Sequence, residues 1–171
     1  MSKRARQYIG ILVAVAAYYL VHEGAHLLYA LSTGVFQQIN FMGLGVQVAV
    51  FSERMTDVQL GIFCLVGAAA TLTVGYLLVL AAAAVCKAKS ALCRAVLYYI
   101  TIAFLLLDPL YLSVLCGLFG GGDMNGIALL LLPAWAARGG FGALLLVNGF
   151  VLWKKALPTC KKSFSDTETK A

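Results

Sequence analysis

The sequence predicts an all-α membrane protein: a polytopic transmembrane helix bundle of about four hydrophobic segments, with a short β-hairpin after the first. Hydrophobic residues fill 62% of its 171 positions and charged residues only 12%, against about 25% charged residues in an average soluble domain. The long apolar runs are separated by short polar links. We expect one integral-membrane domain over residues 1–157, followed by a polar, basic tail over 158–171 that is disordered at the membrane surface.

The first helix is expected over about residues 8–31, which is long enough to cross a hydrocarbon core of about 30 Å. The basic residues before it are also typical of a secretory signal peptide. Because cleavage near Ala16 would strand a histidine motif at a new terminus, we interpret the run as a retained helix. Two β-rich runs joined by glycines predict a hairpin over about 35–51. Its edge either pairs with an unwound substrate or lies as a plain surface hairpin on the headgroups.

Three more apolar segments follow, at about 58–85, 95–118 and 127–153. The first carries small residues from Gly67 to Gly75, which allow close helix packing. The second is expected to be interrupted at Asp108-Pro109, and the third to be kinked or split by Pro133 and by Arg138-Gly139-Gly140. Asn148 is expected to hydrogen-bond across helices or to touch substrate.

Charge and cysteine usage exclude other classes of protein. The net charge of +6 comes from basic clusters near both ends and at 87–94, which indicates lipid headgroups and topology and no nucleic-acid partner. The positive-inside rule places both termini inside, with four crossings. The five cysteines lack CxxC spacing, so we interpret them as small core residues and expect neither disulfides nor a thiolate metal site.

The stretch His22-Glu23-Gly24-Ala25-His26 contains the only two histidines of the chain. At positions i and i+4 of a helix, His22 and His26 share a face and can bind one Zn²⁺ per chain. Glu23 is then placed to take a proton from a metal-bound water. The alternative is a helix whose histidines hydrogen-bond to its neighbours and whose glutamate pairs with a cation. The apolar setting favours the metal, because three polar groups at membrane depth need compensation.

A hydrolytic zinc also needs a third protein ligand and an open position for water. Asp108 and Asp123 are the candidates, and each could instead cap a helix. We favour Asp123, since it lies in a glycine-rich break over 120–126. Irregular backbone at membrane depth persists only where it is buried or lines a wet cavity.

Together these features resemble the site-2 proteases, a family of intramembrane zinc metalloproteases. The resemblance covers roughly residues 8–137 and includes the HExxH motif in the first helix, the β segment over 34–51, the small-residue helix and a late aspartate near glycine. It implies that His22, His26 and Asp123 bind zinc, that Glu23 is the catalytic base and that the β segment helps to present the substrate.

The chain departs from the family at two motifs. The stretch 67–71 reads Gly-Ala-Ala-Ala-Thr where the family usually has Gly-Pro-x-x-Asn, and Asp123 is followed by methionine where the family commonly has Leu-Asp-Gly. The chain therefore looks like a short, divergent member. The family also usually runs the zinc-bearing helix inward, with the β segment on the cytosolic side, which conflicts with four simple crossings under the charge rule.

These observations predict a zinc metalloendopeptidase that hydrolyses a peptide bond of a membrane-protein substrate within or near the lipid bilayer, as in regulated intramembrane proteolysis. We expect a multi-pass protein of the cytoplasmic membrane of a prokaryote. One alternative is a catalytically inactive relative that acts as a binding scaffold. Another is a small transporter, for which an internal repeat is expected and not found.

Overall fold

The computed structural model describes residues 2–43, 45–88, 90–118, 121–130, 133–156 and 158, so the predicted disordered tail lies almost wholly outside the described residues. The elements in chain order are α1 (Lys3–Ser32), β1 (Phe36–Met42), β2 (Gly45–Val50), η1 (Ser52–Arg54), α2 (Asp57–Leu80), α3 (Ala82–Cys86), α4 (Ala91–Ser113), η2 (Leu115–Leu118), α5 (Asp123–Ile127), α6 (Ala134–Val151) and η3 (Leu152–Ala156). The elements η1 and η2 are 3-10 turns, and η3 is a π-helical turn that extends α6.

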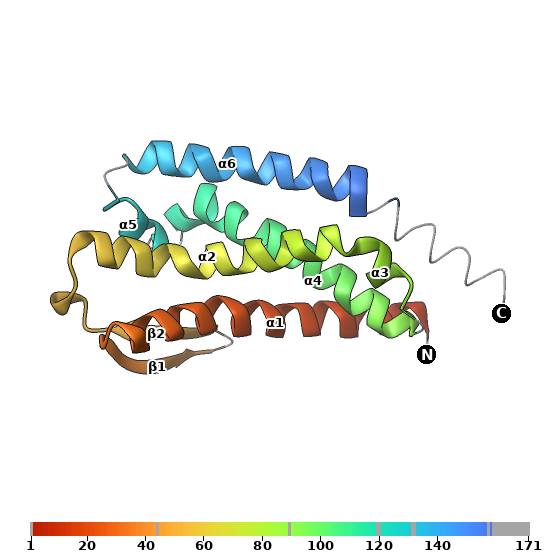
Figure 1. Cartoon of the computed structure of the whole chain (residues 1–171), viewed down its shortest axis with the longest axis horizontal. Helices are drawn as coiled ribbons and strands as arrows, with labels where there is room; N and C mark the ends of the chain where they lie inside the picture. Colours follow the sequence, from red (N-terminus) through yellow and green to blue (C-terminus); the bar gives the residue numbers. More distant parts are fainter. Residues whose placement is uncertain are drawn as a thin grey trace.

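The four long helices form a bundle in which each helix runs opposite to the one before it in the chain, so that α1 and α4 run in the same direction (Figure 1). Helices α1, α2 and α4 pack against one another, and α6 packs on α4. The hairpin lies beside α1 at the end of the bundle opposite the N-terminus, and the short helix α5 packs on α2 at the same end. All four long helices are long and apolar enough to cross a membrane. The prediction of about four hydrophobic segments and one hairpin is therefore confirmed.

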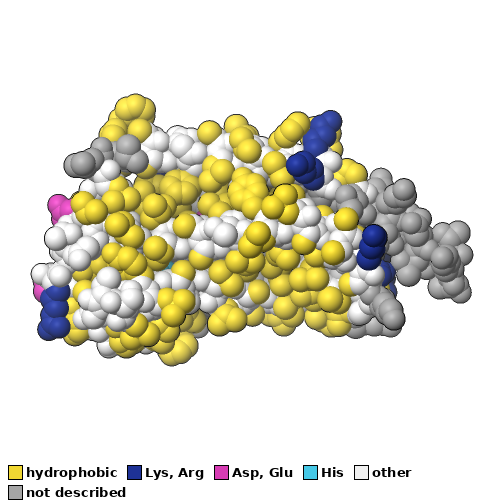
Figure 2. Space-filling model, in the orientation of Figure 1, with side chains coloured by type: hydrophobic (Ala, Val, Ile, Leu, Met, Phe, Trp, Pro, Cys, Tyr) yellow, Lys and Arg dark blue, Asp and Glu magenta, His cyan; other side chains and the backbone are white. Residues whose placement is uncertain are grey.

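The outer surface of the bundle is apolar. Figure 2 shows hydrophobic side chains over its length, with charged side chains gathered towards its two ends. Several large side chains face outward along the helices, among them Leu12 at 71% exposed and Trp135 at 78% exposed. A surface of this size without polar cover is typical of contact with lipid.

The first helix and the hairpin follow local rules. The Ser2 side chain accepts a hydrogen bond from the Ala5 amide and caps α1, while Gly34, at φ 70°, takes the left-handed conformation that ends it. Strands β1 and β2 pair antiparallel with Ile39 opposite Val48, with one irregularity between Phe36 and Gln38. The predicted hairpin over 35–51 is thus confirmed.

Pro109 does not interrupt α4, contrary to the prediction, and Asp108 lies inside this helix and caps nothing. Proline has no amide N–H, so the carbonyl of Leu105, four residues earlier, loses its helical partner. The side chain of Asn148 replaces that partner, because its Nδ2 donates to the Leu105 oxygen at 2.6 Å. The Tyr76 hydroxyl donates in turn to Asn148 Oδ1. Asn148 therefore hydrogen-bonds across helices, which is one of the two roles that the sequence predicts for it.

The last apolar segment is divided only in part as predicted. Pro133 precedes the first residue of α6 and separates it from α5 and the turn that follows, but Arg138-Gly139-Gly140 continue through α6 without a break. A helical glycine costs about 1 kcal/mol relative to alanine. Opening the helix in apolar surroundings would leave backbone groups unpaired at a cost of several kcal/mol each, so the helix persists.

Candidate metal centre

Two histidines one turn apart face the interior of the bundle from α1. His22 is 7% exposed and His26 is 3% exposed. Their Nε2 atoms lie 3.1 Å apart, so the two rings point the same nitrogen at a common position. This is the arrangement that the i, i+4 spacing of the motif predicts.

Asp123 meets both histidines from the start of α5. The backbone before it turns sharply, since Gly121 and Gly122 have φ values of 89° and 44°, and this turn directs the carboxylate into the bundle. Its Oδ2 lies 3.3 Å from His22 Nε2 and 3.6 Å from His26 Nε2. Burial would raise the pKa of Asp123, but the contacts with the two histidines lower it to about 2.

Helix α2 leaves room for the imidazole rings at Gly67. A Cβ atom at this position would lie 2.5 Å from His26 Nε2 and 2.7 Å from His22 Nε2, which is too close for any real contact. Gly67 begins the run of small residues noted in the sequence, where close helix packing was the expected reason. The structure gives the more specific reason that the α2 backbone lies against the two nitrogen atoms.

The convergent atoms suit a metal ion. One ligand atom from each of His22, His26 and Asp123 lies within 4.8 Å of the other two. Imidazole nitrogens and a carboxylate oxygen, with space for a water, are the donor set of hydrolytic zinc sites. Geometry of this kind also accepts other divalent transition metals, so the choice of zinc rests on the sequence motif.

Asp108 lies on the opposite side of the His22 ring and is not one of the three convergent groups. Its Oδ1 is 3.1 Å from His22 Nδ1 and accepts a hydrogen bond from the Tyr18 hydroxyl at 2.5 Å, while its Oδ2 accepts one from Thr71. Sequence reasoning named neither Tyr18 nor Thr71 as a site residue. The local signal for Tyr18 is its position one helical turn before His22. Thr71 follows Gly67 by one turn and stands where the family motif Gly-Pro-x-x-Asn has its asparagine.

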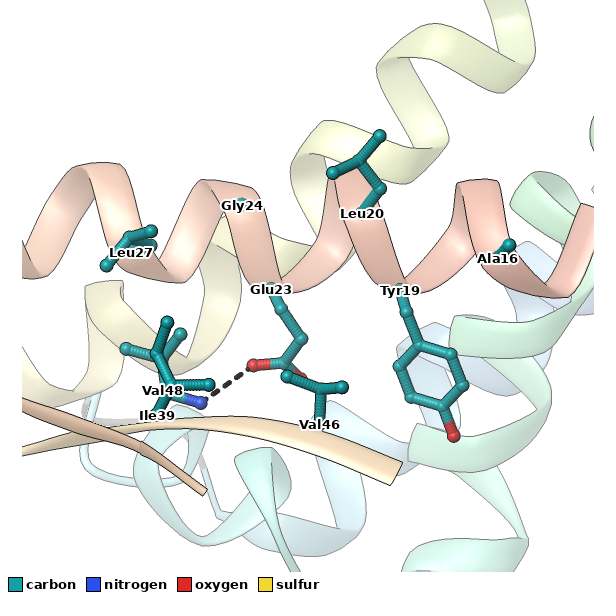
Figure 3. A pocket seen from close by; sticks show the side chains of 9 residues that line it. All are labelled: Ala16, Tyr19, Leu20, Glu23, Gly24, Leu27, Ile39, Val46 and Val48. Atoms are coloured by element: carbon teal, nitrogen blue, oxygen red, sulfur yellow. Dashed lines mark hydrogen bonds between the residues drawn. The ribbon is translucent and has the colours of Figure 1, made fainter. Parts of the chain in front are cut away.

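The Glu23 side chain extends from α1 towards strand β2 (Figure 3). Its Oε2 accepts a hydrogen bond from the Val48 amide at 2.9 Å. Between α1 and the hairpin lies a cavity of about 340 Å³ that Glu23 borders. The other lining residues are nearly all apolar: Ala16, Tyr19, Leu20, Gly24, Leu27, Ile39, Val46 and Val48.

The structure thus brings three of the four predicted site residues into one cluster and places the fourth, Glu23, beside the cluster at a strand edge. No protein-family model, curated protein or solved structure matches the chain. The functional assignment therefore depends on the motif and on this geometry.

Proposed function

We propose that this chain is a multi-pass membrane zinc metalloprotease, a short and divergent member of the site-2 proteases, that hydrolyses a peptide bond of a membrane-protein segment. One observation carries the proposal: two histidines and an aspartate converge inside an apolar bundle, and the glutamate of the same motif accepts a hydrogen bond from the edge of strand β2. The exposed leucines and tryptophan on the outer faces of the helices are unfavourable in water, whereas in a bilayer they contact the lipid chains.

His22, His26 and Asp123 are the residues that would hold the ion. When bound, zinc supplies Lewis-acid polarisation of the scissile carbonyl and lowers the pKa of the attacking water. Glu23 accepts the proton that this water loses as its oxygen bonds to the carbonyl carbon. Glu23 then returns the proton to the amide nitrogen as the C–N bond breaks. The apolar surroundings exclude bulk water and strengthen these interactions.

The hairpin supports the presentation of an extended substrate. The described sheet has two strands, and the Val48 amide points away from β1 to Glu23. Because backbone groups alternate in direction along a strand, those of Val46 point to the same side. A substrate unwound from its own helix has to pair its backbone groups, and this side of β2 offers partners beside the apolar cavity.

The distribution of charge supports one orientation in the membrane. The N-terminus, the α3–α4 link and the C-terminal end of α6 lie at one end of the bundle (Figure 1), and their basic residues are Lys3, Arg4, Arg6, Lys87, Arg94, Lys154 and Lys155. The positive-inside rule makes this end cytoplasmic. Since α6 is continuous, four simple crossings are consistent with the charge rule, and we propose that the hairpin lies on the outer side, unlike the usual arrangement of the family.

The proposal is tested with the purified protein in detergent, using as probes β-casein and a quenched transmembrane peptide with a central glycine pair. Wild-type protein should cleave at least one probe. Glu23→Gln should retain the metal and lose turnover by about 10²- to 10⁴-fold. The matched control, Glu53→Gln, changes an exposed glutamate in η1 and should cleave as wild type does. Undiminished cleavage by Glu23→Gln would exclude this mechanism, and a metal-loaded wild type that cleaves neither probe would favour the scaffold alternative.

A further inference from the structure

Asp108 joins three helices at one buried carboxylate. It belongs to α4, is 1% exposed, and is contacted by Tyr18 from α1 and Thr71 from α2. Both of these residues donate a hydrogen bond from their hydroxyl group to the Asp108 carboxylate. No lysine or arginine of the described residues forms a salt bridge with Asp108. A carboxylate buried in this way is costly unless it interacts with a partly positive group.

The nearest nitrogen of this kind belongs to the ring of His22, in a contact that has ion-pair distance but not hydrogen-bond geometry in this structure. Nδ1 of this ring lies 3.1 Å from Asp108 Oδ1, whereas Nε2 faces His26 and Asp123. Tyr18, which donates to the same oxygen, stacks on the ring with centroids 5.3 Å apart. Asp123 and Asp108 therefore approach the two different nitrogens of one imidazole.

We propose that Asp108 is a positioning residue that selects the metal-binding tautomer of His22. A carboxylate beside Nδ1 keeps the proton on Nδ1 and leaves the lone pair of Nε2 free for the ion, and its negative charge makes that lone pair more basic. Tyr18 and Thr71 hold the carboxylate in place. This inference rests on the proposed function, because it assigns Asp108 a role towards the same metal.

The rival explanation is that Asp108 only ties three helices together. That role predicts a less stable protein with unchanged metal affinity, whereas positioning predicts an affinity loss in protein that is still folded. Asn148→Ala is the matched control. It also removes a buried hydrogen bond between two helices, but this bond involves neither histidine.

The experiment measures the dissociation constant for Zn²⁺ of the solubilised full chain by competition with a chelator, for wild type, Asp108→Ala, Asp108→Asn, Asp123→Ala and Asn148→Ala. We expect Asp108→Ala to bind one ion per chain about 10- to 100-fold more weakly than wild type. Asp108→Asn, which keeps the shape and loses the charge, should weaken binding to a smaller extent. Asn148→Ala should bind as wild type does.

A second readout reports the tautomer directly. The chain has only two histidines, so ¹⁵N-histidine labelling gives spectra of two rings. One ring should show an Nδ1 proton hydrogen-bonded to a carboxylate, and Asp108→Ala should remove that signal. Folded Asp108→Asn with wild-type affinity and spectrum would overturn the inference. Complete loss of metal in Asp108→Ala, as in Asp123→Ala, would also overturn it and make Asp108 a ligand. A folded wild type that binds no metal would instead overturn the proposed function itself.

Discussion

The amide of Val48 donates a hydrogen bond to the carboxylate of Glu23 at 2.9 Å, which joins the candidate catalytic base to the outer edge of strand β2. The two residues are 25 positions apart in the chain, and the contact forms because the hairpin folds back along α1. The groups proposed to hydrolyse the peptide bond and those proposed to hold the substrate backbone are therefore adjacent.

Val48→Pro tests this contact. Proline has no N–H, and because the Val48 amide points away from β1, its loss leaves the pairing with β1 in place. We expect proteolysis to fall by roughly tenfold or more, the effect of losing a hydrogen bond to a charged group worth about 1.5–3 kcal/mol. Metal content should stay at the wild-type level. Val48→Ala retains the N–H and should retain most activity, so equal losses in the two variants would speak against a role for the amide.

Gly67→Ala tests the contact between α2 and the histidines. The added methyl group would lie 2.5 Å from His26 Nε2, so the rings must turn or the helices must separate. Both movements disturb the convergence of ligand atoms, and we expect Zn²⁺ affinity to fall by roughly tenfold or more. Gly149→Ala in α6, where an added Cβ would meet nothing within 4 Å, is the matched control and should bind zinc normally. Unchanged affinity in Gly67→Ala would mean that no ion binds between these rings.

Asn148→Ala should lower stability through the carbonyl of Leu105. The substitution leaves that buried oxygen without a donor, which costs about 1–3 kcal/mol of the free energy of unfolding. The measurement is unfolding in detergent by denaturant titration. In a Pro109→Ala background the backbone amide at 109 can again donate to Leu105, so the cost of Asn148→Ala should be smaller there. An identical cost in both backgrounds would show that the carbonyl is not the cause.

Cysteine labelling tests the proposed orientation. Cys93 is exposed at the basic end of the bundle, and Glu53 is exposed at the hairpin end. In cells, a membrane-impermeant maleimide should label Glu53→Cys, made in a Cys93→Ser and Cys160→Ser background, without permeabilisation. The native Cys93, in a Cys160→Ser background, should react only after permeabilisation. The reverse pattern would favour the orientation usual among site-2 proteases.

The sequence predicts those parts of the molecule that depend on local patterns. Hydropathy locates the long helices, glycines locate the hairpin, and helical spacing places His22 and His26 on one face. The interruption expected at Pro109 is wrong, because the freed carbonyl finds its donor in Asn148, 43 positions away along the chain, and no local pattern contains that contact. For the same reason the sequence does not reveal the place of Asp108, the less favoured candidate for the third ligand, which lies beside His22 Nδ1.

The measurement that tests the central claim most directly is the metal content of purified protein by elemental analysis, for wild type, Asp123→Ala and Asp57→Ala. Asp57 is an exposed aspartate in the first turn of α2 and serves as the matched control. The account predicts about one zinc per chain in wild type and in Asp57→Ala, and its loss in folded Asp123→Ala. A folded wild type without metal, or Asp123→Ala with a full complement of zinc, would contradict it.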